Sequence, residues 1–156
     1  MMDISFKVNG KSEQLTVGTS ETVAELLRET LHLTGCRIAC DGEVCGSCTV
    51  LIEGKPAAAC STFAFQLDGR SVETIEGLSS NGHLHKIQQA FLETNAFQCG
   101  FCTAGFVLSV KALLDSDPQP SDQKIAEWLK ANVCRCTGYR SILAATRLAA
   151  TRMREE

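Results

Sequence analysis

The stretch Cys40-Asp41-Gly42-Glu43-Val44-Cys45-Gly46-Ser47-Cys48 constrains the fold of this chain more than any other, because it places three thiols in one short segment. A fourth thiol, Cys60, follows after a turn at Gly54. Thiolates are soft ligands that suit iron and sulfide. Three of them can converge on one small cluster from a loop, where Gly42 and Gly46 let the backbone pass close to it. The stretch therefore predicts a metal-binding loop.

The spacing of these four cysteines is C-x4-C-x2-C…C, which is typical of plant-type ferredoxins that hold a 2Fe-2S cluster on four thiolates. A strand at Thr49–Ile52, a turn at Glu53 to Pro56 and a return through Ala57 to Ala59 would bring the fourth cysteine back beside the loop. The predicted ligands of a first cluster are Cys40, Cys45, Cys48 and Cys60.

The residues around this loop predict a small α+β sheet domain. Apolar and polar residues alternate from Asp3 to Val8, Asn9-Gly10 is a strong hairpin turn, and Gln14 to Val17 can return as a second strand. Thr22 and Glu25 have the spacing of a capping box, and apolar positions up to Leu31 then follow a helical period. A last strand is expected at Ser71 to Ile75.

After residue 82 the apolar pattern becomes helical and predicts four helices. The residues that form these apolar stripes are Leu84, Ile87 and Phe91; Phe106, Val107, Val110, Leu113 and Leu114; Ile125, Trp128 and Leu129; and Ile142, Ala145, Ala149 and Met153. The segment Asp117-Pro118-Gln119-Pro120 must interrupt the helices. We expect domains at 1–76 and 83–156, with 77–82 as the linker.

A second quartet lies in the helical region, in the pattern C-x2-C-x31-C-x-C. A helix of about 12 residues after Cys102 travels roughly 18 Å, and a second helix of similar length after Pro120 can travel back. Both cysteine pairs would then meet at one end of the helices. The predicted ligands of a second cluster are Cys99, Cys102, Cys134 and Cys136.

Other roles for the nine cysteines agree less well with the sequence. A disulfide framework suits small exported proteins, whereas this chain of 156 residues has an odd number of cysteines and no visible export signal. A zinc site is the structural alternative, with Cys45, Cys48, Cys99 and Cys102 as a four-thiolate set. That set leaves the remaining cysteines unexplained, so iron-sulfur clusters are the better hypothesis.

Composition excludes several other classes of protein. Hydrophobic residues make up 44% and charged residues 21%, as in a globular protein, and the net charge of −3 lacks the basic footprint of a nucleic-acid binder. No apolar run is long enough for a transmembrane segment and no signal peptide is visible, so we expect a cytoplasmic protein.

Both quartets together resemble the small iron-sulfur subunit of the molybdenum hydroxylases, the family of xanthine dehydrogenase, carbon monoxide dehydrogenase and aldehyde oxidoreductase. The resemblance covers nearly the whole chain, through Gly46-Ser47-Cys48-Thr49-Val50, Gln98-Cys99-Gly100-Phe101-Cys102-Thr103 and Cys134-Arg135-Cys136-Thr137-Gly138-Tyr139. It implies an N-terminal β-grasp, ferredoxin-like domain and a C-terminal four-helix-bundle domain, each with one 2Fe-2S cluster.

The resemblance also implies partners and a direction of electron flow. Electrons would pass from molybdopterin in a large subunit to the helical-domain cluster, then to the ferredoxin-like cluster, and usually to FAD in a medium subunit. Such subunits form a heterotrimer, which can dimerise. Gln98 and Cys136 match the family positions that contact the pterin. No catalytic residue is expected in this chain, because the substrate site would lie in the partner.

The chain departs from the family pattern at three positions. Ala104 stands where the family usually has proline, Glu43 where many members have glycine, and Cys36 where threonine is common. We expect a looser start to the following helix, a changed hydrogen-bond pattern around the first cluster that Gly42 can offset, and a ninth thiol outside both clusters.

Two rival functions remain open from the sequence. A zinc-loaded binding or redox-sensing module would be colourless, whereas two 2Fe-2S clusters give a brown protein with equal iron and labile sulfide. A diffusible ferredoxin explains the first quartet and leaves the helical region without a purpose.

Overall fold

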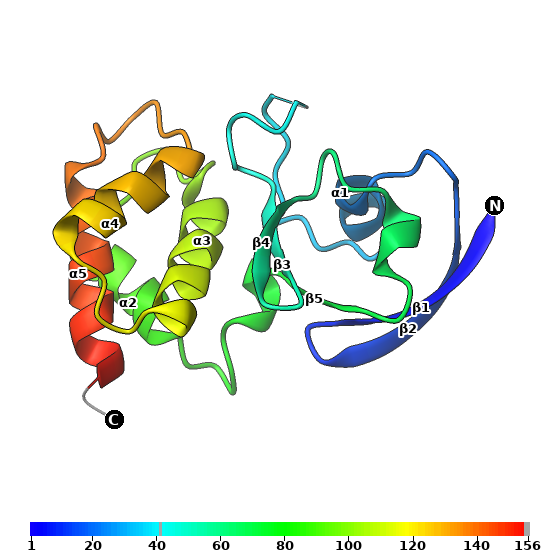
Figure 1. Ribbon diagram of the computed structural model, residues 1–156, viewed down its shortest axis with the longest axis horizontal. Helices are drawn as coiled ribbons and strands as arrows, with labels where there is room; N and C mark the ends of the chain where they lie inside the picture. The colour runs from blue at the N-terminus through cyan, green and yellow to red at the C-terminus, as the bar shows by residue number, and fades with distance from the viewer. Residues whose placement is uncertain (41, 155–156) are drawn as a thin grey trace.

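The structure is a computed structural model that describes residues 1–40 and 42–154. A sheet with short helices forms one half of the molecule and four longer helices form the other (Figure 1). No helix in these ranges is long and apolar enough to cross a membrane. The mixed α/β architecture predicted from the sequence is therefore confirmed.

The sheet has five strands in the order β2-β1-β5-β3-β4. These are β1 (Met2–Val8), β2 (Lys11–Val17), β3 (Thr49–Ile52), β4 (Lys55–Ala58) and β5 (Ser71–Glu73). Strands β1 and β5 run parallel and the other neighbours are antiparallel. The predicted hairpins are present, and Asn9 and Gly10 both adopt the positive φ that a tight turn requires.

Short helical segments connect and cover the strands. They are α1 (Val23–Glu25), the π-helical η1 (Leu26–Thr30), and the 3-10 helices η2 (Ala64–Leu67) and η3 (Ile75–Gly77). The capping box at Thr22 and Glu25 is present. Strand β5 ends earlier than predicted, because the Thr74 amide donates to the Asn9 side chain at 2.8 Å and leaves the ladder.

The helices of the second half are α2 (Lys86–Glu93), α3 (Thr103–Ser116), α4 (Asp122–Trp128) with the 3-10 turn η4 (Leu129–Ala131), and α5 (Arg140–Arg154). They share one apolar core that includes Phe91, Phe106 and Ile142. Helix α2 begins after Leu84, because His85 caps it by accepting the Ile87 amide. Leu84 therefore lies outside the helix and is exposed.

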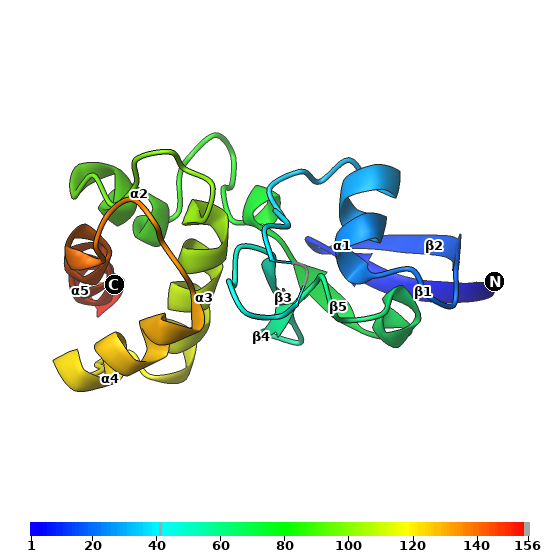
Figure 2. The same ribbon diagram turned by 90° about the horizontal axis from the view of Figure 1, so that it is seen from above.

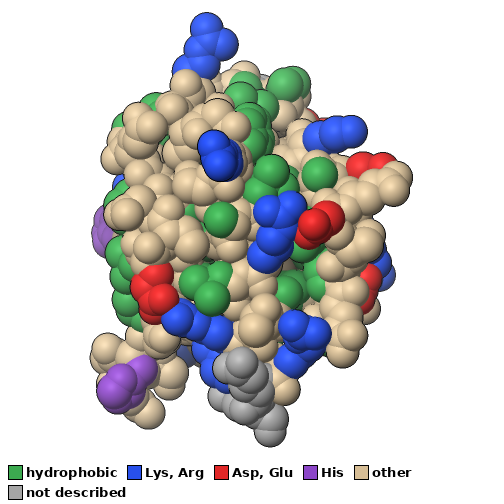
Figure 3. Space-filling view, turned by 90° about the vertical axis from the view of Figure 1, so that its left-hand side faces the viewer, with side chains coloured by type: hydrophobic (Ala, Val, Ile, Leu, Met, Phe, Trp, Pro, Cys, Tyr) green, Lys and Arg blue, Asp and Glu red, His purple; other side chains and the backbone are tan. Residues whose placement is uncertain are grey.

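Helix α3 packs against the β3–β4 edge of the sheet, where Leu51, Leu108 and Ala112 form a small shared core (Figure 2). Lys111 on α3 also pairs with Glu73 at the end of β5 at 3.4 Å. Seen from the helical side, basic side chains are interspersed with apolar patches (Figure 3). With α3 packed on the sheet, the loop before β3 and the loop between η4 and α5 lie on the same side of the molecule (Figure 1).

Candidate metal centres

The first quartet surrounds the loop before β3. Cys40 is exposed, Cys45 is half-buried, and Cys48 and Cys60 are buried where the loop meets β3 and where the chain leaves β4. The amides of Val44 and Cys45 donate to the Cys40 sulfur at 3.4 and 3.3 Å. The loop thus wraps its own N–H groups around a thiolate, an arrangement that stabilises negative charge on sulfur.

The thiols of this quartet differ in pKa because their surroundings differ. Hydrogen bonds from the backbone of Gly42, Cys45 and Val44 lower the pKa of Cys40 to about 6. Burial raises the pKa of Cys48 to about 11, and a thiol contact with Cys60 adds to the rise. A bound metal would have to displace the proton from Cys48, whereas Cys40 is already largely anionic at neutral pH.

The second quartet forms where two loops of the helical half meet. Cys99 and Cys102 precede α3, and Cys134 and Cys136 follow η4. The sulfur of Cys136 lies 3.6 Å from that of Cys99. The structure therefore brings together two pairs that are far apart in the sequence, as the helix lengths predicted.

Hydrogen bonds again distinguish the members of the quartet. Burial and its thiol contact with Cys134 raise the pKa of Cys102 to about 12. Burial also acts to raise the pKa of Cys134, but the hydroxyl of Thr137 at 3.1 Å and its amide at 3.4 Å outweigh it and lower that pKa. Donors to sulfur of this kind tune a metal centre through its ligands.

Both quartets are arranged as two pairs of thiols. Contacts join Cys40 to Cys45 and Cys48 to Cys60 in the first quartet. In the second they join Cys99 to Cys136 and Cys102 to Cys134. All are free thiols. Two irons that share four thiolates need two ligands each, so this donor set fits a 2Fe-2S cluster at both sites.

A single metal ion fits less well. Within residues 1–40 and 42–154, no three His, Cys, Asp or Glu side chains are placed so that they could hold one ion. The zinc alternative also required Cys45 and Cys48 to meet Cys99 and Cys102. In the structure these cysteines make their thiol contacts within their own quartets.

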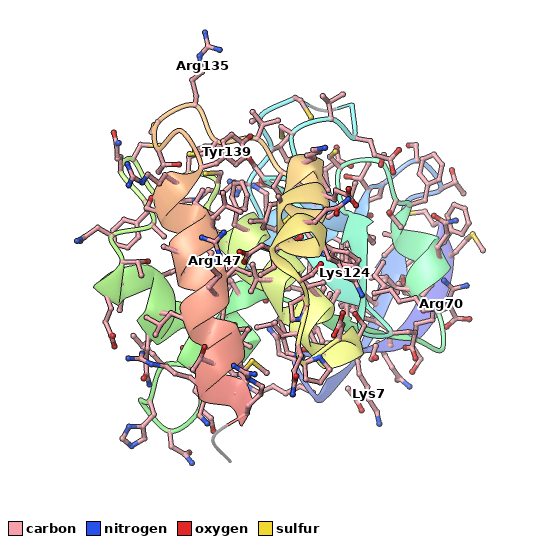
Figure 4. All side chains as sticks on the ribbon, turned by 60° about the vertical axis from the view of Figure 1, so that its left-hand side comes forward. Lys7, Arg70, Lys124, Arg135, Tyr139 and Arg147 are labelled. Atoms are coloured by element: carbon pink, nitrogen blue, oxygen red, sulfur yellow. The ribbon has the colours of Figure 1, made fainter. Side chains whose placement is uncertain are left out.

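Tyr139 supports the second quartet, a role that the sequence pattern does not indicate. Its hydroxyl accepts from the Cys134 amide at 3.1 Å and donates to the Asn132 carbonyl at 3.0 Å. Its ring meets Phe106 edge to face, and its side chain points in among the helices, whereas Arg135 points away from them (Figure 4). The tyrosine thus holds the segment that carries Cys134.

The two quartets are joined by the segment that precedes Cys134. The Val133 amide donates to the Cys45 carbonyl at 2.8 Å, and the Asn132 side chain donates to the Gly46 carbonyl at 2.9 Å. Gly46 has a φ of 68°, and a Cβ there would clash with the amide nitrogen of the Asn132 side chain. Only glycine fits at this junction.

Comparison with known proteins agrees with this geometry. Residues 4–89 match the family described as "2Fe-2S iron-sulfur cluster binding domain", and residues 74–147 match the one described as "[2Fe-2S] binding domain". The nicotine 6-hydroxylase small subunit of Paenarthrobacter nicotinovorans is 44% identical over 92% of this chain and 87% of its own. The chain belongs to the small 2Fe-2S subunits of the molybdenum hydroxylases.

Two further relatives extend the comparison. The nicotinate dehydrogenase small FeS subunit of Eubacterium barkeri is 40% identical over 96% of this chain and 95% of its own. The crystal structure of quinoline 2-oxidoreductase from Pseudomonas putida 86 contains a chain that matches with a TM-score of 0.94 at 42% identity, over 99% of this chain and 96% of that one. The mixed α/β architecture and the family resemblance are thereby confirmed.

Glu43, a departure from the family pattern, adopts a left-handed backbone conformation in the loop of the first quartet. It has a φ of 61°, the left-handed conformation in which glycine is favoured. The backbone of Gly42 forms a hydrogen bond to the Cys40 sulfur, and this bond is the largest of the effects that lower its pKa. Gly42 thus supplies a donor beside Glu43, as expected, while the conformational strain remains at Glu43.

The other two departures lie at Ala104 and Cys36. Ala104 is in the first turn of α3, where the Phe106 amide bonds to the Cys102 carbonyl at 3.1 Å. The first backbone hydrogen bond of the helix is therefore formed, although the Cys102 side chain does not cap it, and a looser start stays a prediction. Cys36 is buried, with its thiol 3.6 Å from the Cys48 carbonyl. It packs beside the first quartet without joining either pair of thiols.

Proposed function

We propose that this small subunit carries electrons between the molybdopterin centre of a large subunit and an acceptor, through two 2Fe-2S clusters held by the two quartets. The observation that carries the proposal is the 2.8 Å hydrogen bond from the Val133 amide to the Cys45 carbonyl. Cys45 is a proposed ligand of the first cluster, and Val133 adjoins Cys134, a proposed ligand of the second. One hydrogen bond and one peptide link therefore connect the two proposed ligands Cys45 and Cys134.

The proposed ligands are the eight cysteines already described, two for each iron. Cys40 with Cys45, and Cys48 with Cys60, would hold the first cluster. Cys99 with Cys136, and Cys102 with Cys134, would hold the second. When bound, each cluster supplies a one-electron carrier. The chain's own residues hold the thiolates, donate to them from backbone amides and Thr137, and keep the two ligand loops in contact.

The proposed pterin contact lies at Gln98 and Cys136. The Gln98 side-chain amide donates to the Cys136 carbonyl at 3.0 Å, and both residues are exposed. Val133 and Phe101 add exposed apolar surface at the same end of the helices. An exposed end of this composition suits contact with a partner subunit that carries a polar, ring-shaped cofactor.

The rest of the assembly follows the family resemblance. We propose a large molybdopterin subunit and a medium FAD subunit in a cytoplasmic heterotrimer. Within this chain we propose a β-grasp, ferredoxin-like domain at 1–76, a linker at 77–82 and a four-helix-bundle domain at 83–156. The separate cores on the two sides of residue 75 support this division.

Metal analysis of the complex purified from its native host tests the clusters. We expect four irons and equal labile sulfide for each copy of this chain, with two distinct electron paramagnetic resonance signals after reduction. The signals should differ because one centre lies in a sheet loop and the other between helix ends. Two irons for each chain, or zinc, would contradict the proposal.

Rapid mixing with substrate tests the order of electron flow. We expect Gln98→Ala, still loaded with iron, to slow reduction of both clusters, because the second cluster would receive electrons first. Glu43→Ala is the matched control at the edge of the first quartet and should leave the first step intact. The reverse pattern would show that electrons enter at the first cluster.

A further inference from the structure

Arg37 is the side chain that crosses from the first ligand loop to the second. Its backbone amide donates to the Ser47 carbonyl at 3.4 Å, within the first loop. Its guanidinium donates to the Gly100 carbonyl at 3.2 Å, between Cys99 and Cys102. The same guanidinium lies 5.4 Å from the centre of the Phe101 ring, within the range of a cation–π contact.

The charge of Arg37 is not neutralised by a carboxylate in the described part of the chain. The ion pairs within residues 1–40 and 42–154 involve Lys111, Lys124, Arg147 and Arg152. Arg37 instead donates to the Gly100 carbonyl and stacks on the Phe101 ring. These two contacts position the guanidinium without neutralising its positive charge. A guanidinium remains protonated at any physiological pH, so this charge is permanent.

We propose that Arg37 tunes the reduction potentials of both centres, and that of the second centre more strongly. The inference rests on the proposed function, because it requires a cluster in each quartet. Reduction of a 2Fe-2S cluster adds one electron and therefore one negative charge. A fixed cation nearby stabilises the reduced form, and the stabilisation weakens with distance and with solvent screening. The guanidinium contacts the backbone between two ligands of the second centre, but reaches the first only through its own main chain.

Redox titration of the intact complex, followed by electron paramagnetic resonance, tests this inference. We expect Arg37→Gln to lower the equilibrium constant for reduction of the second centre about tenfold, with a smaller decrease at the first, as Coulomb attraction at an effective dielectric of about 20 near a protein surface implies. Arg37→Lys keeps the charge but loses the planar stacking, so both potentials should stay near those of the wild type. Arg147 lies part-way along α5 (Figure 4) and pairs with Asp122 at 2.7 Å, so Arg147→Gln should change neither potential.

The outcomes separate a role of charge from a role of shape. Equal shifts in Arg37→Gln and Arg37→Lys would show that the contact is only structural and would overturn the inference, as would unchanged potentials in Arg37→Gln. If Arg37→Gln fails to load iron, Arg37→Met gives a charge-free side chain that still packs on Phe101. Absence of iron from the wild-type complex would instead contradict the proposed function.

Discussion

Each cysteine quartet brings four thiols together, but the two quartets do so through different parts of the chain. The first lies in one loop and one hairpin, so its geometry is set largely by residues close in sequence. The second is assembled from two segments separated by the whole of α3, α4 and η4. Its ligands converge only if these helices pack correctly. The first centre should therefore tolerate damage to the helical core, whereas the second should not.

A large cavity in the helical core should expose this difference most clearly. Phe106 is fully buried and contacts the Tyr139 ring. We expect Phe106→Ala to cost about 3–5 kcal/mol of stability and to remove iron from the second quartet first. Iron analysis and the two resonance signals provide the measurement. The matched control is Phe6→Ala, also buried, in the sheet core. Equal loss from both quartets in either variant would contradict the distinction.

A substitution at the junction between the quartets should reduce stability nearly as much as Phe106→Ala. Gly46→Ala forces a side chain into a left-handed residue that faces Asn132, so we expect a cost of about 2–5 kcal/mol from strain and overpacking. Electron transfer between the two centres should slow in any protein that loads. Gly54 has a φ of 72° with nothing within 4 Å of an added Cβ. In thermal unfolding, Gly54→Ala should therefore lose only the stability that the left-handed backbone conformation costs an alanine. If Gly54→Ala and Gly46→Ala lost the same stability, the role of the junction would be contradicted.

Cys36 tests whether the first quartet is complete without a ninth thiol. We expect Cys36→Ser to keep the full iron content and visible spectrum, because the four proposed ligands already form two pairs without it. A hydroxyl at this buried site should cost about 1–3 kcal/mol of stability. Thermal unfolding and iron analysis measure the two effects separately. Loss of one resonance signal would show that the ligand assignment is wrong.

Glu43 is the site of the smallest expected change in stability, and its substitution is the only one of these that we expect to increase stability. Glu43→Gly relieves a left-handed backbone conformation, so we expect the first centre to be stabilised by about 1 kcal/mol. The rate at which its visible absorption is lost on heating provides the measurement. The second centre in the same protein serves as the control. A destabilised first centre would mean that the glutamate side chain contributes more than its backbone strain costs.

Much of the fold follows from local patterns. The hairpin at Asn9-Gly10, the capping box at Thr22 and the helix break at Pro118 depend on neighbouring residues, and all three are present. Positions near element ends are harder to predict. Leu84 follows the helical period, but His85 caps the helix after it. Ile75 continues the apolar pattern of the last strand, but a side chain from Asn9 draws the backbone away.

The candidate sites divide in the same way. The order of residues along the chain was enough to indicate the family, the eight thiols and the cluster type they suit, because ligand chemistry and spacing are local properties. Tertiary packing was needed to learn that Val133 bonds to Cys45, that Tyr139 holds Cys134 and that Arg37 reaches Gly100. These contacts join separate loops or distant segments, and no periodicity or spacing encodes them. They exist because α3 packs on the edge of the sheet and brings the loops of both quartets to the same side of the molecule.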